Sequence, residues 1–359
     1  MEKENAVKMI EMLSNARGVS GFEDEVTALI RSFGQGLGRF SEDSMRNLYI
    51  GRSAAADGDA PVLQLDAHSD EVGFMVKAVR PNGTLDFIPL GGWVAYCIPA
   101  HRVLVRNADG TYIPGVIASK PPHFLPPDQQ KLTPEIGDMV IDIGASSDRE
   151  VREDYRIRIA SPVVPDVRFE YRREHDIMIG KAFDNRLGCA AAIAALRDLA
   201  GDELRVNVKA AFASQEEVGL RGASVSAQEV KPDAAIVFEG CPADDTVVES
   251  HAVQTALKKG PMLRHIDSRM ITNPRFQRFS LDVAEANRIP VQEAVRTGGS
   301  TNGGVIQFTG KAVPVIVIGI PVRYIHTHYG IASYTDFENS VKLACEIIRA
   351  LNRETVDGF

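Results

Sequence analysis

The chain has 359 residues, of which 44% are hydrophobic and 25% are charged, and its formal net charge is −8. This composition is typical of a globular protein and argues against a disordered or fibrous one. The acidic balance, without any block of basic residues, argues against nucleic acid and anionic membranes as partners.

Two features of the sequence bear on the compartment. The N-terminus is charged and lacks the apolar core of a signal peptide, and there is no run of about 18 apolar residues. The four cysteines are widely spaced and form no Cys-x-x-Cys pair, which argues against a structural zinc knuckle and a disulfide framework. We therefore expect a cytoplasmic protein without a membrane span.

The N-terminal region is predicted to contain two helices followed by two strands. Apolar residues recur at helical spacing over 7–16. Ser20 and Glu23 match a capping box, which predicts the start of the second helix. A short strand at 48–50 and a stronger one at 61–68 are expected to follow.

The pattern changes in the next hundred residues or so. Strand-like runs follow one another and are separated by turn signals at 81–83 and 109–110, whereas helical periodicity is restricted to 147–153. We therefore expect a small all-β module that occupies residues 69–164.

Beyond this module, strands and helices alternate again. A strongly apolar helix is predicted at 190–199, and the continuous apolar runs at 234–238 and 312–320 are typical of inner strands buried on both faces. The chain is therefore predicted to form an α/β domain, built from residues 1–68 and 165–359, that the β module interrupts.

Two adjacent glutamates close the predicted central strand at 206–212. Glu216 and Glu217 precede Gly219, where the chain is expected to turn. At a strand end that begins to turn, both carboxylates can reach one cleft, where one could hold a metal and the other could move a proton. A solvated acidic turn is the structural alternative.

Further metal-competent residues lie at predicted strand ends or turns, namely His68, Asp70, Asp184, Glu239 and His326. Taken singly, each has an ordinary explanation, such as a hydrogen-bonded histidine, a helix N-cap at Asp184 or a turn glutamate. Ligands of open α/β sheets bind outside the carboxyl ends of the strands, where residues distant in sequence can converge. Two histidines and several carboxylates at one such edge predict a two-metal site.

Four motifs carry a resemblance that spans nearly the whole chain. They are His68-Ser-Asp70-Glu-Val-Gly73-Phe, Lys181-Ala-Phe-Asp184-Asn-Arg186-Leu-Gly, Ser214-Gln-Glu216-Glu217-Val-Gly-Leu-Arg221-Gly and Arg323-Tyr324-Ile-His326. Together they resemble the M42 family of dinuclear metallo-aminopeptidases, which includes the TET aminopeptidases and proteins named glutamyl aminopeptidase or FrvX-like. The resemblance implies a phosphorylase/hydrolase-like catalytic domain, a barrel-like, PDZ-like module for dimerisation, and a homo-oligomer, commonly a dodecamer.

The resemblance also implies which residues would hold the metals. Asp184 would bridge two divalent ions. His68 and Glu239 would complete one site, and Glu217 and His326 would complete the other. Zinc or cobalt is expected, and manganese is also suited by carboxylate and imidazole ligands.

Two residues would serve the chemistry without bridging the ions. Glu216 would act as the general base on the attacking water, and Asp70 would orient His68. The implied reaction is metal-dependent removal of the N-terminal residue from peptides that have a free N-terminus.

The sequence departs from the family pattern at two positions. Glu239 stands where the family usually has aspartate, and its extra methylene changes the reach of the ligand. Asn302 closes the segment Gly298-Gly299-Ser300-Thr301-Asn302, where the family usually has Gly-Gly-Thr-Asp. Both differences bear on metal affinity and on substrate preference.

Three other functions stay open at the level of sequence. The same metal site could serve a deacylase or deblocking amidohydrolase. A glycosidase could use Glu216 and Glu217 as acid and nucleophile, with carboxyls about 5–9.5 Å apart and no metal, but this leaves the histidines unexplained. A catalytically decayed binding or assembly protein would have neither metal nor activity.

Overall fold

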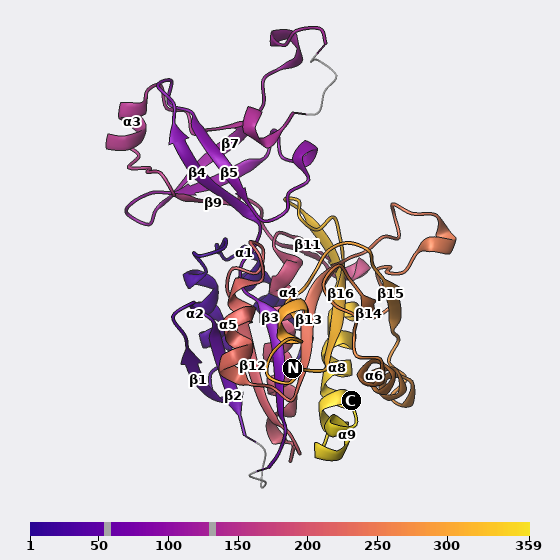
Figure 1. The fold of residues 1–359 in the computed structure, drawn as a ribbon. Helices are drawn as coiled ribbons and strands as arrows, with labels where there is room; N and C mark the ends of the chain where they lie inside the picture. The colour runs from indigo at the N-terminus through magenta and orange to yellow at the C-terminus, as the bar shows by residue number, and fades with distance from the viewer. Residues whose placement is uncertain (54–58, 129–133) are drawn as a thin grey trace.

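The structure is a computed structural model that describes residues 1–53, 59–128 and 134–359. It consists of a large α/β domain and a β-barrel that extends from one end of it (Figure 1). The helices are α1 (Lys3–Asn15), α2 (Asp24–Phe33), α3 (Asp148–Glu153), α4 (Phe183–Asp198), α5 (Arg221–Val230), α6 (Pro274–Ala286), α7 (Gly303–Ile306), α8 (Tyr334–Ala350) and α9 (Arg353–Asp357). The strands are β1 (Arg39–Glu42), β2 (Leu48–Arg52), β3 (Val62–His68), β4 (Gly73–Val79), β5 (Leu85–Leu90), β6 (Arg102–Arg106), β7 (Tyr112–Ala118), β8 (Val140–Asp142), β9 (Pro162–Pro165), β10 (Glu170–Arg172), β11 (Ile177–Gly180), β12 (Asn207–Ala213), β13 (Ala234–Pro242), β14 (Met262–Ile266), β15 (Gln292–Val295), β16 (Val315–Arg323) and β17 (Gly330–Ser333).

An eleven-stranded sheet forms the centre of the α/β domain. Its main path runs β1-β2-β12-β3-β13-β16-β17-β11-β10, and β14 joins β16 on one side and β15 on the other. The four central strands β12, β3, β13 and β16 are parallel to one another. Their carboxyl ends therefore meet at one edge of the sheet, which is where ligands bind in open α/β sheets.

Strand β13 shows why the sheet is covered on both faces. Ile236 and Phe238 pack into a core with residues of α1, α4 and α8. Ala235 and Val237 point the other way and pack with residues of α5 and α7. Because successive side chains of a strand alternate between faces, a continuous apolar run supplies both cores, as predicted for this strand.

The barrel is closed by the strand order β4-β5-β8-β7-β6-β9. It has a hydrophobic core of its own, which includes Phe74, Leu85, Ile141 and Val163. Its helix α3 begins after Ser147, whose side chain accepts a hydrogen bond from the backbone N–H of Glu150. The predicted fold class, an α/β domain interrupted by a small all-β module, is confirmed.

The predicted capping box of the second helix is wrong. Helix α2 begins at Asp24 and has no side-chain cap. The Ser20 hydroxyl instead donates to Asp70 at 2.6 Å, and the Glu23 carboxylate accepts the backbone N–H of Gly21 at 2.8 Å. Both residues are buried, and each also has a partner that is distant in sequence, Asp70 for Ser20 and the backbone N–H of Gln215 for Glu23.

Element boundaries also differ from the predictions. The apolar helix predicted at 190–199 is α4, which already begins at Phe183, although Asp184 and Asn185 have non-helical dihedrals. The strand predicted at 312–320 is β16, which begins at Val315. None of the helices in the described part of the chain combines the length and hydropathy that a membrane span requires.

Candidate metal centre

The parallel strands place His68 and Glu239 at the same level of the sheet edge. His68 is the last residue of β3 and lies opposite Ala213 of β12. Val237 of β13 lies opposite Asp66 of β3, so Glu239, two residues further along, is level with His68. Glu239 belongs to the strand and is buried, so the alternative of a turn glutamate is wrong.

The other candidate ligands come from irregular backbone next to these strands. Glu216 and Glu217 follow β12 after Gln215, which has a φ of 52°, and His326 follows β16 with a φ of 58°. These are left-handed conformations, which are uncommon for residues other than glycine. Asp184 has extended dihedrals at the beginning of α4, and the next residue, Asn185, provides the cap, because its Oδ1 atom accepts the backbone N–H of Gly188 at 3.0 Å.

Asp184 lies between the two histidines. Its Oδ1 atom is 3.0 Å from Nε2 of His68, and its Oδ2 atom is 3.4 Å from Nε2 of His326. A carboxylate whose two oxygens face two different imidazoles has the arrangement of a bridging ligand. Glu217 approaches the second of these imidazoles, with Oε2 at 3.5 Å from Nε2 of His326.

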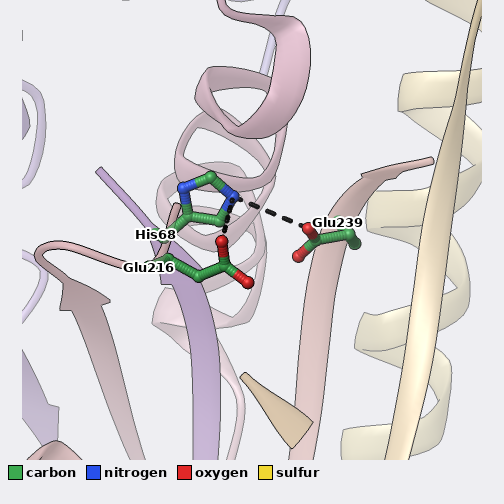
Figure 2. A group of neighbouring side chains, drawn as sticks. All are labelled: His68, Glu216 and Glu239. Carbon is green, nitrogen blue, oxygen red and sulfur yellow. Dashed lines mark ion pairs between the residues drawn. The ribbon is translucent and has the colours of Figure 1, made fainter. Parts of the chain in front are cut away.

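His68 also faces two glutamates from neighbouring elements (Figure 2). Nε2 of His68 is 3.6 Å from Oε1 of Glu239 and 4.0 Å from Oε2 of Glu216. The donor atoms of these three residues lie within 4.8 Å of one another, as do those of His68, Asp184 and Glu217. Judged by distance alone, Glu216 and His68 are therefore close enough to bind the same metal ion.

Burial and mutual repulsion raise the pKa of the glutamates. Burial is the largest cause for Glu216 and Glu217, and neighbouring carboxylates add to it, so that both pKa values lie well above their usual range. Burial and the charge of Asp184 raise the pKa of Glu239 to about 7. Burial alone would lower the pKa of His68, but the surrounding carboxylates raise it well above its ordinary value. The cluster therefore carries excess negative charge that a cation would relieve.

The residues of the cluster fit a pair of divalent cations. Imidazole nitrogens and carboxylate oxygens are ligands that zinc, cobalt and manganese accept in proteins. The Oε1 atom of Glu217 is buried and has no hydrogen-bond partner among the described residues, which is unfavourable for a carboxylate unless a cation lies nearby.

Asp70 connects a metal ligand to the glutamate turn. It is fully buried, and its Oδ1 atom is 3.3 Å from Nδ1 of His68. The same carboxylate accepts the backbone N–H groups of Glu216 at 2.9 Å and of Glu217 at 3.2 Å. Asp70 can therefore hold the His68 ring and the turn that carries both glutamates in a fixed relation.

Three supporting residues were not among the predicted site residues. Ser20 donates to Asp70, as described above, and Glu23 accepts the backbone N–H of Gln215 at 3.1 Å. Asn185 donates to Oε2 of Glu239 at 3.1 Å and to the carbonyl of Phe238 at 2.8 Å. Asn185 lies in the motif that begins at Lys181, so the sequence offered a signal for it. Ser20 and Glu23 were interpreted as a capping box, and their contacts with the site were therefore not predicted.

Asn302 lies outside the candidate centre. It is fully buried, and its Nδ2 atom donates to Oδ1 of Asp66 at 2.6 Å. Gln64 donates to the other oxygen of Asp66 at 2.9 Å. The amide at position 302 therefore satisfies a buried carboxylate on β3 and does not face the ligand cavity.

A cavity of about 370 Å³ opens onto the cluster. Asp184, Glu216, Glu217, Glu239 and His326 line one part of it, and residues from β14 and from the segment after β15 line another. Of the seven predicted site residues, five line this cavity, and His68 and Asp70 contact residues that line it. No helix or strand contains more than one of the metal-ligand candidates.

Comparison with known sequences identifies a family. A sequence model described as M42 glutamyl aminopeptidase matches residues 50–343. The chain is 33% identical over 356 residues to FrvX of Escherichia coli (strain K12), which is described as an aminopeptidase, with 98% of each chain covered. It is 32% identical to the glutamyl aminopeptidase of Lactococcus lactis subsp. cremoris (strain MG1363), with 97% of each covered.

Solved structures share the whole fold. The TET aminopeptidase of a marine sediment archaeon, Thaumarchaeota archaeon SCGC AB-539-E09, superposes with a TM-score of 0.95 at 37% identity and 99% coverage of both chains. The TET1 peptidase of Pyrococcus horikoshii, which can assemble into a tetrahedron or a large octahedral shell, has a TM-score of 0.85 at 27% identity. The match covers 96% of this chain and 100% of that one.

Proposed function

The chain belongs to the M42 family of peptidases and is a metal-dependent aminopeptidase, and on this premise we propose how its residues divide the work. Asp184 would bridge two divalent ions, with His68 and Glu239 as further ligands of one and Glu217 and His326 as further ligands of the other. The observation that carries this proposal is the placement of the two Asp184 oxygens at 3.0 Å and 3.4 Å from two different imidazoles. The relatives named above are aminopeptidases, so neither the deacylase nor the decayed-site alternative gains support.

Glu216 is the proposed general base. When bound, two divalent ions lower the pKa of a water towards neutrality and polarise a carbonyl. Glu216 would take a proton from the water that attacks the scissile carbonyl and would return it to the leaving amine. Bound cations would offset the carboxylate repulsion that raises the pKa of Glu216 in the metal-free cluster, so that its carboxylate can accept a proton.

Asp70 is the proposed positioning residue of the centre. It keeps the His68 ring oriented through Nδ1 and fixes the turn that carries Glu216 through two backbone N–H groups. Asp70 touches neither the substrate nor the reacting water in this proposal. Its effect on the rate would come from the placement of these two groups.

The assembly and the native ions complete the proposal. Residues 1–68 and 165–359 form the catalytic domain, and residues 69–164 serve dimerisation. Exposed aromatic side chains on the barrel support this role, with Tyr96 72% and Phe124 64% exposed. A dimer-based homo-oligomer, in the manner of a dodecamer, is proposed, with zinc or cobalt as the ions. The four free cysteines suit a reducing compartment, and a cytoplasmic location is part of the proposal.

The substitution Glu216→Gln tests the role of the base. The amide keeps the size of the side chain but cannot accept a proton, so kcat is expected to fall by about 10²–10⁴-fold. Metal content, measured by elemental analysis, is expected to stay at about two ions per chain. Glu285→Gln, the same change at an exposed position of α6, is the matched control and should retain full activity. A metal-loaded Glu216→Gln protein that still turns over would remove Glu216 from this role.

A further inference from the structure

Lys181 and Arg186 lie in the motif that carries Asp184, yet the proposed chemistry uses neither of them. Both side chains are buried, and so is Glu71, which follows Asp70 in the motif that begins at His68. Charged groups that are removed from water need partners inside the protein, because an unpaired buried charge is costly. The partners of these three residues identify the segments that the charges connect.

Glu71 binds both cations with one carboxylate. Nζ of Lys181 donates to Oε1 of Glu71 at 2.6 Å and to Oε2 at 2.7 Å. Nη2 of Arg186 donates to the same Oε1 atom at 3.3 Å. Hydrogen bonds between ionised groups are about twice as strong as those between neutral groups. One buried carboxylate therefore fixes two side chains of the neighbouring motif.

The two cations lie on either side of a candidate metal ligand. Asp184 comes three residues after Lys181 and two residues before Arg186. Asp184 has extended dihedrals, and Ala182 has a left-handed φ of 55°, so this segment lacks the regular backbone of a strand or a helix. Such backbone keeps its conformation when surrounding contacts determine it. Glu71 provides these contacts at both ends of the segment.

Glu71 is also close in sequence to a second candidate ligand. It comes three residues after His68, whose Nε2 atom is 3.0 Å from Oδ1 of Asp184. His68 and Asp184 are 116 positions apart in the chain. The Glu71 carboxylate is therefore a direct connection between the segment that carries His68 and the segment that carries Asp184.

The loop between α1 and α2 completes the cluster. The carbonyl of Ala16 accepts Nζ of Lys181 at 2.8 Å and Nη1 of Arg186 at 3.1 Å. The carbonyl of Gly18 accepts Nη2 of Arg186 at 3.0 Å and the backbone N–H of Glu71 at 3.0 Å. An ammonium has three donors, so Lys181 has an acceptor for each of them and is held in one position.

The buried ion pair is better explained by geometry than by stability. The cost of removing charges from water can exceed their attraction, and apolar residues of similar volume are often at least as stabilising. What the ion pair provides here is a defined distance between two segments, and both segments carry proposed ligands of the same ion. Contacts that orient ligands in this way strengthen metal binding.

We propose that Glu71 and Lys181 are positioning residues of the metal centre, which hold His68 and Asp184 at the separation that one cation requires. The proposal rests on the metal centre proposed above and adds the contact that fixes two of its ligands. Arg186 supports the same carboxylate from the other end of the Asp184 segment. Neither Glu71 nor Lys181 is among the described residues that line the cavity, so substrate binding should not depend on them directly.

Lys181→Met tests this connection. The substitution keeps an unbranched side chain and removes the ammonium, while Arg186 remains as a counter-ion for Glu71. Calorimetric titration of the chelator-treated protein with zinc or cobalt measures the metal affinity, and binding of at least one ion is expected to weaken about 10–100-fold. Saturating metal should restore kcat without a change in KM. Unchanged metal affinity would overturn the proposal, and so would a raised KM, which would place Lys181 in substrate binding.

Asp176→Asn separates positioning from general stability. Asp176 precedes β11, whereas Lys181 follows it. The Asp176 carboxylate accepts Nζ of Lys3 at 2.9 Å and the hydroxyl of Ser333 at 2.8 Å. Loss of this ion pair should lower the free energy of unfolding in urea and leave the metal affinity unchanged. If metal affinity falls equally in Lys181→Met and Asp176→Asn, then it only follows stability, and the proposal is overturned.

Glu71→Gln tests the other partner of the ion pair. The amide keeps the size of the side chain but loses the charge that both cations bind, so the metal affinity should fall at least as far as in Lys181→Met. Retained affinity in a folded Glu71→Gln protein would overturn the proposal. If one of the two variants does not fold, as judged by circular dichroism, the other decides.

Failure of the proposed function gives a different result. If the unmodified protein binds no metal in the same titration, the proposed centre is rejected, and its positioning residues are rejected with it. If the unmodified protein binds metal and the folded Lys181→Met protein binds it equally well, the centre is retained and only the positioning role is rejected.

Discussion

Buried carboxylates outside the metal cluster hold the glutamate turn in place. Asp70 accepts the backbone N–H groups of Glu216 and Glu217, and Glu23 accepts that of Gln215. Gln215 has a left-handed backbone, a conformation that persists when the surrounding structure fixes it. Three successive N–H groups are therefore bound by two buried acids, which fixes the backbone that carries Glu216, the proposed general base.

Glu23 is expected to make stability depend on pH. Burial, with the charge of Asp70, raises its pKa to about 7. Between about pH 4.5 and 7 the folded chain keeps a proton that the unfolded chain releases, so the free energy of unfolding falls as the pH rises. The limit for one group is about 1.4 kcal/mol per pH unit. Glu23→Gln keeps an acceptor oxygen and should reduce the total decline by about 1–3 kcal/mol.

Urea unfolding of the metal-free protein between pH 5 and 8 measures this effect. Glu249→Gln, the same change at an exposed position, should reproduce the pH dependence of the unmodified protein. If Glu23→Gln also reproduces it, then Glu23 is already ionised in the folded state below pH 5, and its proposed contribution is absent.

The seven candidate site residues, which the structure brings together, could be selected from the sequence because metal-binding residue types at strand ends are visible without coordinates; their roles stay a prediction. Ser20 and Glu23 were misinterpreted for a physical reason. A capping box and a pair of long-range hydrogen bonds use the same residue types at the same spacing, and only the fold shows which partners are near. The role of Asn302 was not visible in the sequence for the same reason, because its partner Asp66 lies 236 positions away in the chain.

At the scale of elements, aromatic rings connect the barrel to the loop of a metal ligand. Trp93 stacks on Phe74 of the barrel core, with ring centroids 4.6 Å apart. His328 packs against Trp93 at 5.1 Å and stacks on His101 at 4.0 Å. His328 is two residues beyond His326, so the barrel segment that carries Trp93 and His101 supports the loop of this ligand.

Removal of one ring tests this connection. His101→Ala leaves His328 without its stacking partner. The loop that carries His326 should then be less ordered, and the metal affinity of the site should fall. Changes of residues that orient ligands typically cost about 10–100-fold in metal affinity, and we expect a change near the lower limit. Activity titrated against added metal measures it, with kcat restored at saturation. His175→Ala, at an exposed histidine, is the control. A reduced kcat that excess metal cannot restore would point to a different role.

Elements were predictable where burial imposes a pattern. Strand β13 was found because it is apolar throughout, and the barrel was found because its strands are frequent and its turns are marked by glycine. Strands β14 and β15 were missed, since they are short and carry polar residues. Their pairing also depends on contacts such as Met262 opposite Gly319, which no local pattern contains. Arg264 and Arg296, which line the cavity, lie in β14 and directly after β15 and were missed with these strands.

At the scale of the whole molecule, the site joins segments from most of the chain. His68 and His326 are separated by nearly the whole α/β domain in sequence, and the barrel is inserted between His68 and Asp184. The buried carboxylates that converge there repel one another when no cation is bound, as the raised pKa values of Glu216 and Glu217 indicate. The global stability of the protein should therefore depend on the metal.

Chelation is expected to lower the melting temperature. A ligand that binds only the folded chain adds about 2.7 kcal/mol at a concentration one hundred times its Kd, so added zinc or cobalt should raise the melting temperature of the chelated protein. Calorimetry with and without metal measures the shift. Asp184→Asn weakens the proposed bridge and should lose most of it, whereas Glu216→Gln should keep it because the base is not one of the proposed ligands. An equal loss of the shift in both variants would mean that Glu216 also holds a metal, as its distance of 4.0 Å from His68 allows. If metal does not shift the melting temperature of the unmodified protein, then the folded chain does not bind metal and the proposed metal centre is wrong.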